Sequence, residues 1–396
     1  MTSSNYEKSN RILLVDSLRG FALLGLFFVH MLEYFELYWF NPENSIYHDI
    51  IFFLFAGKAY ALFALLFGFS FFIIINNQLK RGIDFRPKFV WRLTLLLLFG
   101  FLHGLLYGGD ILVVLAAAGF ILIPFFNVPN KILLTLSLFF LFQIPSIIYL
   151  NLFVDSSSLQ NPWHWELFGN ILPVYAEGSF FELIQTTLWN SQIAKWAFMF
   201  ESGRLFTILG MSFLGLFLGK IQFFKNPNKF SKIINIFLPL SFLSAALMMI
   251  FKEALTLDFN WIQNSIYNSI SDLLITFTQF LIFIKLYNLS IGTKFLNYLA
   301  PCGKMSLTIY ILQSLIFVPF FYGFGLGAYQ FIGQANSFYL GLIFWAIQMY
   351  YANIWFRKYQ FGPMEWLWRS LTYLTFSIKF KKENKDIKAD TVKAVI

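Results

Sequence analysis

The residues of this sequence that could do chemistry are histidines and charged side chains placed inside long apolar runs. The stretch LVDSLRGFALLGLFFVHM carries Asp16 and Arg19 at one end and His30 within the apolar part. In a helix, Arg19 and His30 would lie within about 20° of one stripe, and Asp16 within about 60° of it. The helical rise would separate Arg19 from His30 by roughly 16 Å. One helix face would then carry the pair Asp16 and Arg19 at one end and the His30 imidazole within the apolar part.

A second histidine stands in FGFLHGLLYGGDILVVLAAAGF, which contains His103 and Asp110. We predict a helix that ends at Gly108–Gly109, after which Asp110 could cap the next helix. The position of His103 places it in the same half of the membrane as His30. Imidazole can take or give a proton near neutral pH, so two of them beside an acid suit proton abstraction from a hydroxyl. The candidate catalytic residues are therefore His30, His103 and Asp110, although capping alone would also explain Asp110.

Other polar groups at membrane depth are candidates for binding a substrate. Lys58 lies inside FLFAGKAYALFALLFGFS. A charged residue within a span costs about 2.5–3.5 kcal/mol on insertion scales, so this lysine must face a cavity, an anion or an acidic partner. Gln313, in a later apolar run, likewise needs a polar partner or a cavity. The candidate substrate-binding residues are Asp16, Arg19, Lys58, Gln313 and Arg369.

Several charged side chains have simpler interpretations as ion pairs or interfacial groups. Glu365 and Arg369 are four residues apart in FGPMEWLWRSLTY and can pair on one helix face. Glu201 and Arg204 are three apart and can pair in the same way. His164 stands between two tryptophans in NPWHWE, a pattern typical of an interfacial aromatic belt.

The composition defines the fold class that must position these residues. Of the 396 residues, 58% are hydrophobic and 12% are charged, and the mean hydropathy is +0.65. Soluble domains carry about 25% charged residues, so this composition indicates an all-α, polytopic integral membrane protein. A span needs about 20 apolar residues. The sequence predicts about ten spans, at roughly 14–38, 50–76, 90–107, 110–126, 132–153, 196–219, 233–251, 266–288, 305–324 and 336–356.

The placement of lysine and arginine predicts the orientation. If the N-terminus is cytoplasmic, the loops NNQLKRGIDFRPKFVWR and KIQFFKNPNKFSK fall on the cytoplasmic side, as the positive-inside rule expects. An even number of spans then places both termini in the cytoplasm. The net charge of +9 resides in these short loops, which argues against nucleic acid as a partner. Of 29 basic residues, four fall elsewhere: Lys58, Lys195, Arg204 and Lys252.

The chain is predicted to form one membrane domain with short ends. Residues 1–10 would be a cytoplasmic N-terminus, and residues 11–379 a single transmembrane helical domain. Within that domain, 154–195 is the longest outer loop, and 361–375 is predicted to form a helix at the inner interface, where its tryptophans suit a membrane boundary. The basic tail 380–396 is expected to be disordered.

Some kinds of chemistry lack their usual motifs. The chain contains no phosphate-binding glycine loop, no HExxH and no GxSxG. The single Cys302 excludes an intrachain disulfide and a cysteine-based metal cluster. Four scattered histidines do not form a recognisable ligand pattern, so no metal is predicted.

Several segments together resemble domain-of-unknown-function family 418, the YeiB-like bacterial membrane proteins. The segments DSLRGFALLGLFFVH, GKAYALFALLFGFSF, GFLHGLLYGGDIL, GKMSLTIYILQSLI and FGPMEWLWRSLTY occur in the order of that family and cover most of the chain. The first segment is also similar to the start of the acyltransferase-3 and heparan-alpha-glucosaminide N-acetyltransferase groups. Many members of the YeiB-like family carry asparagine where this chain has His30, which makes His103 a rival for the base.

The more distant resemblance implies an acyltransferase in the bacterial cytoplasmic membrane. Such relatives move an acyl group, usually acetyl, from cytoplasmic acyl-coenzyme A to a sugar across the membrane. Here the acceptor would be a hydroxyl or amine of an envelope glycan or of a lipid-linked molecule. One histidine would act as general base, while Lys58 or a helix N-terminus would stabilise the oxyanion. Arginine binds phosphate in a bidentate manner. The donor phosphates would lie near Arg19 and the basic residues Lys80, Arg81, Arg86 and Lys88.

A transporter is the alternative that the sequence leaves open. Lys58, His103 and Asp272 would then form a proton relay or a substrate path through the membrane. No inverted repeat or pair of broken helices is visible in the sequence, which favours the acyltransferase. The lipid bilayer is a partner in either case, and the sequence gives no indication of an oligomeric state.

Overall fold

The fold is known from a computed structural model that describes residues 12–40, 42–153, 161–254 and 259–382. The predicted N-terminus 1–10 and most of the predicted tail 380–396 lie outside the described residues. Within them, the chain forms helices and one isolated antiparallel bridge between Tyr359 and Lys381. The α-helices are α1 (Leu13–Leu32), α2 (Ile46–Phe55), α3 (Ala59–Leu79), α4 (Arg86–Leu106), α5 (Leu112–Leu122), α6 (Asn130–Leu141), α7 (Ile144–Phe153), α8 (Trp163–Glu177), α9 (Phe180–Leu188), α10 (Asn190–Glu201), α11 (Arg204–Lys220), α12 (Ser231–Ala254), α13 (Trp261–Tyr287), α14 (Ser290–Leu296), α15 (Ala300–Lys304), α16 (Ser306–Phe321), α17 (Gly333–Lys358) and α18 (Pro363–Tyr373).

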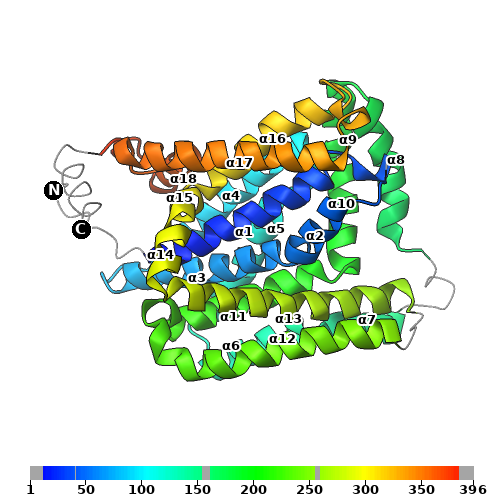
Figure 1. The fold of residues 1–396 in the computed structure, drawn as a ribbon. Helices are drawn as coiled ribbons and strands as arrows, with labels where there is room; N and C mark the ends of the chain where they lie inside the picture. Colours follow the sequence, from blue (N-terminus) through cyan, green and yellow to red (C-terminus); the bar gives the residue numbers. More distant parts are fainter. Residues whose placement is uncertain (1–11, 41, 154–160, 255–258, 383–396) are drawn as a thin grey trace.

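Helix α1 is the central element of the bundle. It contacts α2, α3, α15, α16 and α17, and most of its residues are buried. Around it, α3 packs on α11, α11 packs on α6, and α4 packs on α5. The long helices run roughly parallel or antiparallel across the molecule, with α14, α15 and α18 near one end and α8 and α9 near the other (Figure 1). Residues in the middle of α1 are therefore enclosed on several sides.

Small residues allow the central helices to approach closely. A Cβ added at Gly68 of α3 would overlap the backbone oxygen of Ser212 in α11, and one at Gly215 would overlap that of Leu65. Close contact through small residues is typical of helix pairs in membranes, where van der Waals packing replaces the hydrophobic effect between helices. This packing fixes the α3–α11 pair against α1.

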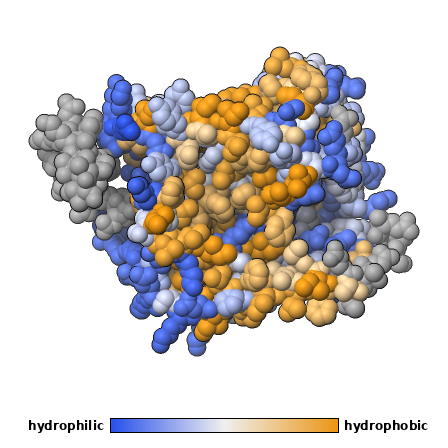
Figure 2. All heavy atoms as spheres, viewed as in Figure 1, coloured by the Kyte–Doolittle hydropathy of each residue, from blue (hydrophilic) through white to orange (hydrophobic). Residues whose placement is uncertain are grey.

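The surface is that of a protein that crosses a bilayer. Figure 2 shows an apolar band over the middle of the helices, with hydrophilic residues concentrated at the two ends. Helix α12 illustrates the outward face, where large apolar side chains are more than half exposed: Ile236, Phe237, Leu240, Leu243 and Leu247. A soluble protein rarely exposes so large a contiguous apolar surface.

Among the described residues, five helices are long and apolar enough to cross a membrane, or up to eight if each bent pair is one span. The single spans are α1, the continuous stretch Ile46–Leu79, α4, Pro227–Lys252 and α13, and the bent pairs are α6–α7, α10–α11 and α14–α16. The predicted all-helical fold is confirmed, and five to eight candidate spans agree with a polytopic membrane protein, whereas the predicted count of ten is not confirmed. Helix α5 with its short continuation reaches only from Leu112 to Phe125. Helix α17 has 26 residues but carries polar side chains such as Gln334 and Gln348.

The predicted outer loop 154–195 contains much regular structure. Helices α8 and α9 and the beginning of α10 occupy its described residues. The predicted interfacial helix 361–375 corresponds to α18, which begins after Gly362 and packs on α4 and α16. Arg92 of α4 lies 3.6 Å from the ring centre of Trp368, and the Trp368 indole donates a hydrogen bond to the Arg92 backbone oxygen.

Candidate functional site

A histidine–aspartate pair is buried where α4 gives way to α5. His103 Nδ1 lies 2.7 Å from Asp110 Oδ2, and the two side chains are 3% and 0% exposed. Because an ionised carboxylate only accepts hydrogen bonds, Asp110 favours the tautomer that carries its proton on Nδ1. His103 Nε2 is then the basic nitrogen, and it is buried without a hydrogen-bond partner among the described residues. This arrangement can take a proton from a bound group.

The local sequence explains how the pair forms. Helix α4 ends at Leu106, and the turn through Gly108 and Gly109 returns the chain so that Asp110 faces His103. Asp110 Oδ1 also accepts a hydrogen bond from the Val113 backbone N–H, at 3.1 Å, in the first turn of α5. The predicted cap and the predicted catalytic role therefore use different oxygens of one carboxylate.

His30 reaches the same region from α1, as the predicted shared depth requires. Its ring lies 5.1 Å from that of Tyr107 and 6.1 Å from that of Tyr310. His103 contacts the same two tyrosine rings, at 5.8 Å and 5.0 Å. Both imidazoles therefore pack against the same pair of tyrosine rings. The structure thus brings all three predicted catalytic residues, including Asp110, into one cluster.

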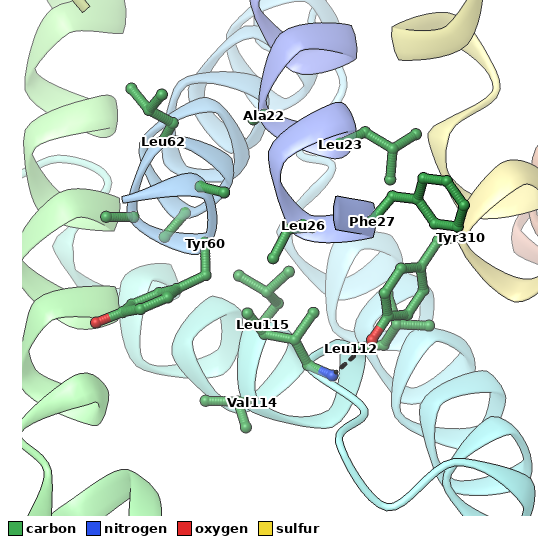
Figure 3. Close-up of a cluster of buried hydrophobic side chains, with 14 of the residues drawn as sticks. Ala22, Leu23, Leu26, Phe27, Tyr60, Leu62, Leu112, Val114, Leu115 and Tyr310 are labelled. Carbon is green, nitrogen blue, oxygen red and sulfur yellow. Dashed lines mark hydrogen bonds between the residues drawn. The ribbon is translucent and has the colours of Figure 1, made fainter. Parts of the chain in front are cut away.

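Tyr310, which contacts both histidines, belongs to an apolar core built by α1, α3, α5 and α16. Figure 3 shows Leu26 and Phe27 of α1 near Leu112 and Leu115 of α5, all in one core. The hydroxyl oxygen of Tyr310 accepts a hydrogen bond from the backbone N–H of Ile111, at 3.3 Å, and this bond is the dashed line in Figure 3. A fixed Tyr310 holds the start of α5, and with it Asp110, in place.

A small cavity of about 60 Å³ adjoins His30. Its wall includes two cationic side chains, Lys195 of α10 and Arg204 of α11, and one acidic side chain, Glu33. Lys195 is only 3% exposed, and its Nζ has no hydrogen-bond partner among the described residues. Arg204 lies over the rings of Phe198 and Tyr60, 4.5 Å and 5.5 Å from their centres. The cavity therefore has a mostly apolar wall into which two basic side chains and one acidic side chain are set.

The predicted substrate residue Lys58 is held in an ion pair. Its Nζ lies 2.6 Å from Asp272 Oδ1 on α13, and the Lys58 side chain is 6% exposed. The pair forms at the break between α2 and α3, where Gly57 adopts a positive φ of 78°. A Cβ at Gly57 would overlap the Asp272 carboxylate, so glycine is required for this approach. The sequence required Lys58 to face a cavity, an anion or an acidic partner. The structure supplies the acidic partner, Asp272.

Asp16 and Arg19, at the other end of the predicted stripe on α1, lie apart from the histidines. Arg19 donates hydrogen bonds to Asp16 Oδ1 at 3.2 Å, to Ser70 Oγ at 2.8 Å and to the Gly303 backbone oxygen at 3.3 Å. The side chain of Arg19 is 18% exposed. These bonds tie α1 to α3 and α15. Asp16 and Arg19 thus form a joint between helices at the end of the molecule that carries α15.

The basic loop near that end contains its own ion pair. Arg86 Nη2 lies 2.8 Å from Asp84 Oδ2, and both side chains are exposed. Hydrogen bonds from Arg86 hold the pKa of the Asp84 carboxyl at about 2. Lys88 lies 5.2 Å from the ring centre of Tyr373 in α18. Part of the predicted phosphate-attracting charge is therefore already engaged within the protein.

The remaining predicted residues do not join the histidine cluster. Gln313 donates a hydrogen bond of 3.0 Å to Gln348, which supplies the polar partner that the sequence required. Arg369 lies 5.1 Å from the ring centre of Phe361. Glu365, expected to pair with Arg369, instead accepts hydrogen bonds from Leu307 N, at 2.7 Å, and from Thr308 at the start of α16.

The expected pair between Glu201 and Arg204 is also replaced by other contacts. Glu201 lies 2.7 Å from Nδ1 of His164 and accepts a hydrogen bond from the His164 backbone N–H. His164 is buried by this contact rather than exposed in an aromatic belt. A second histidine–carboxylate pair thus exists, and its residues do not line the cavity beside His30.

Lys195 and Arg204 were missed as site residues, although the sequence carried a signal for them. They are two of the four basic residues that depart from the predicted charge bias, and Lys58 is a third. Lys195 and Arg204 line the cavity, and Lys58 directly follows Gly57 in its wall. The fourth, Lys252, is accounted for by a 2.9 Å hydrogen bond to Asn264. Basic residues that depart from the predicted positive-inside bias were thus the sequence signal for the residues around this cavity.

A larger hollow of about 340 Å³ lies beyond the C-terminal end of α1, and it shares no lining residue with the cavity beside His30. Its wall includes Glu36, Glu43, Tyr38 and Tyr329. Across the described ranges, no three His, Cys, Asp or Glu side chains are grouped so that they could hold a metal ion. The histidine cluster and its cavity are therefore the best candidate for chemistry.

The fold and this site define a helical integral membrane protein with titratable groups enclosed between its helices. Residues 218–375 match the family described as protein of unknown function (DUF418), which confirms the family resemblance found in the sequence. The matched residues include Asp272, Gln313 and Arg369, and the histidine cluster precedes them.

Three relatives extend this comparison. The uncharacterized protein YxaH of Bacillus subtilis (strain 168) is 28% identical over 94% of this chain and 97% of its own length. An uncharacterized 39.9 kDa protein in the amylase 3' region of Bacillus acidopullulyticus is 25% identical over the same shares. The uncharacterized protein YeiB of Escherichia coli (strain K12) is 36% identical over 19% of each chain. No activity is named for them, so the resemblance to acyltransferases stays a prediction.

Proposed function

We propose that this protein is a membrane-embedded acyltransferase of the bacterial cytoplasmic membrane. It would move an acyl group, with acetyl as the first candidate, from acyl-coenzyme A to a hydroxyl or amine of an envelope glycan or lipid-linked acceptor. The observation that carries the proposal is the buried His103–Asp110 pair, whose Nε2 has no partner among the described residues. A polar nitrogen left unpaired in a protein interior costs free energy, which a functional role would offset.

The chemistry follows from the protonation of the pair. His103 Nε2 removes the proton of the acceptor O–H or N–H while the acceptor atom attacks the thioester carbonyl carbon. Asp110 stabilises the imidazolium that results. When the tetrahedral intermediate collapses, the C–S bond breaks and the imidazolium returns the proton to the leaving thiolate. The products are the acylated acceptor and free coenzyme A, so atoms and charges balance.

Neighbouring groups supply two further roles in this proposal. Lys58 is neutralised by Asp272, so Lys195 replaces it as the cation that stabilises the oxyanion. His30 contacts the rings of Tyr107 and Tyr310 beside His103, which places it to orient the acceptor.

The donor would bind from the end of the molecule that carries Arg19. The basic loop near α18 offers the exposed charges of Lys80 and Arg81 for the phosphates of coenzyme A. Arg19 and Asp16, partly exposed and buried respectively, would form the inner wall of the donor path. In this arrangement Arg19 acts through its bonds to Ser70 and Gly303 as a positioning residue.

The test is transfer of radiolabelled acetyl from acetyl-coenzyme A by the purified full-length protein in nanodiscs, with an envelope glycan extract as acceptor. Release of the coenzyme A thiol is followed in parallel. We expect His103→Gln to lower the rate by about 10²–10⁴-fold. His164→Gln is the matched control, because it removes a histidine with the same 2.7 Å carboxylate contact outside the cavity. Equal rates in the wild type and His103→Gln, or no coenzyme A binding and no transfer, would overturn the proposal.

A transporter remains the second candidate, and one structural observation favours it. Three helix pairs that together could span the membrane are bent by 51°, 69° and 74° at short breaks. Broken helices often form substrate and ion sites in transporters. The test is uptake of labelled sugars into proteoliposomes under a pH gradient. Uptake that disappears in Lys58→Met, together with an absence of acetyl transfer, would favour this function.

A further inference from the structure

Lys195 is the starting point, because a buried lysine without a hydrogen-bond partner is unusual. The residue is 3% exposed and belongs to the wall of the cavity beside His30. Among the described residues nothing accepts a hydrogen bond from its Nζ. A buried charge is normally paired or bound to a ligand, since leaving it unpaired is costly. The cavity is therefore missing an anionic acceptor at this point.

The charges in the cavity wall do not balance. Lys195 and Arg204 contribute two cations, and Glu33 contributes the one acidic side chain of the wall. The Asp272 carboxylate is bound to Lys58 at 2.6 Å and the Asp110 carboxylate is hydrogen-bonded to His103 at 2.7 Å, so neither accepts a hydrogen bond from Lys195. An anion in the cavity would supply the hydrogen-bond acceptor that the Lys195 Nζ lacks.

Three helices also begin at the cavity wall. Gly57 stands two residues before α3, Ile111 directly precedes α5, and Arg204 is the first residue of α11. Helix N-termini carry free backbone N–H groups and partial positive charge, and they favour anions. Two of these three starts follow a residue with positive φ, Gly57 at 78° and Gly203 at 71°. These breaks turn the helix starts into the interior of the bundle.

We infer that this cavity binds a phosphoryl group of the acceptor substrate. This inference rests on the proposed function, because it assigns the acceptor to the class of phosphorylated molecules. A volume of about 60 Å³ admits a group of a few heavy atoms, and a phosphoryl group has oxygens enough for Lys195, Arg204 and the helix starts together. The remainder of the acceptor would extend past His30 toward His103.

The phosphoryl group could belong to a lipid or to a soluble phosphate ester, and the chemistry in the cavity is the same. The experiment uses full-length protein in dodecyl maltoside, which contains no phosphate. One arm titrates inorganic phosphate by calorimetry at constant ionic strength. The other adds dioctanoyl phosphatidic acid, with dioctanoyl glycerol as its uncharged counterpart. Saturable binding in the first arm indicates a soluble ester, and saturation in the second arm alone indicates a lipid.

The decisive variant is Lys195→Met, which removes the charge and keeps the length of the side chain. We expect it to weaken binding of the phosphate probe at least tenfold, while Lys195→Arg retains binding within a few fold. Lys252→Met is the matched control, because Lys252 is a second basic residue outside the predicted charge bias and has its own partner in Asn264. It should bind the probe within twofold of the wild type.

The melting temperature provides an independent readout. Without phosphate, Lys195→Met should melt at or above the wild-type temperature, because an unpaired buried charge has been removed. Phosphate should raise the melting temperatures of the wild type and of Lys252→Met, but not that of Lys195→Met. A lower melting temperature of Lys195→Met without phosphate, or equal probe binding by wild type and variant, would overturn the inference.

Binding and turnover separate the two proposals. His103→Gln should bind the phosphate probe as the wild type does and lose acyl transfer. Phosphate binding that depends on Lys195 supports the anion site even where no acyl transfer is found, and the proposed function then fails alone. Acyl transfer by a protein that binds neither probe overturns this inference and leaves the proposed function.

Discussion

His103 Nδ1 and Asp110 Oδ2 lie 2.7 Å apart across the break between α4 and α5. The other carboxylate oxygen of Asp110 holds the first turn of α5 through Val113. One carboxylate thus fixes both the tautomer of the histidine and the position of a helix. A substitution at Asp110 can separate these two tasks.

Asp110→Asn should strongly lower activity while the fold is kept. The amide oxygen can still accept the Val113 N–H, since asparagine caps helices as well as aspartate does. The amide NH₂ would donate to His103 Nδ1, so the imidazole proton would move to Nε2 and the base would be lost. We expect a fall in acetyl transfer of about 10²–10⁴-fold with little change in melting temperature. A variant with wild-type turnover would show that Asp110 serves as a cap alone.

His30→Asn should retain more activity than His103→Gln. Ring contacts with Phe35, Tyr107 and Tyr310 surround His30, whereas His103 is oriented by a carboxylate. If His30 only orients the acceptor, its loss should raise KM more than it lowers kcat. The measurement is the dependence of acetyl transfer on acceptor concentration in the two variants. A deeper loss of kcat in His30→Asn than in His103→Gln would make His30 the base.

Gly57→Ala should destabilise the protein through two effects. Its φ of 78° is unfavourable for alanine, and the new Cβ would overlap the Asp272 carboxylate that binds Lys58. Gly82 has a similar φ of 76° and open space around it, so Gly82→Ala measures the backbone effect alone. We expect about 1–2 kcal/mol for Gly82→Ala and more for Gly57→Ala. Thermal unfolding in detergent compares them, and equal losses would contradict the overlap.

The helical membrane fold could be predicted because hydropathy and charge bias act over whole segments. The overlap of the predicted span 50–76 with the candidate span Ile46–Leu79 shows how well an apolar run indicates a crossing. Individual side-chain contacts were harder to predict from the sequence. Whether Glu365 pairs along its own helix or caps α16 depends on packing between segments nearly sixty residues apart, which no local spacing determines.

The candidate site was predictable only in part. His30 and His103 were placed at one depth by helical geometry, and the structure brings them together. The approach of α10 and α11 was not predictable, since it depends on the 69° bend between these helices. The departure of Lys195 and Arg204 from the predicted charge bias was visible in the sequence. That the two side chains line one cavity became clear only from the structure.

Glu365→Ala should destabilise the contact between α18 and α16. The carboxylate accepts hydrogen bonds from the backbone N–H groups of Leu307 and Thr308, at 2.7 Å and 3.2 Å, and from the Thr308 hydroxyl. It thus caps α16 from another helix, and these groups would lose their acceptor in the alanine variant. We expect a loss of about 1–2 kcal/mol, typical of a removed N-cap, measured by thermal unfolding in detergent.

Glu365→Gln is the matched variant for that measurement. The glutamine side-chain oxygen can still accept from Leu307 and Thr308, and only the negative charge at the start of α16 is lost. Its loss of stability should therefore be smaller than that of Glu365→Ala. If Glu365 instead acted through Arg369, Arg369→Ala would cost as much as Glu365→Ala, and the glutamine variant would resemble both. The contacts of Arg369 with the rings of Phe361 and Tyr373 argue for the first outcome, in which the cap carries the stability.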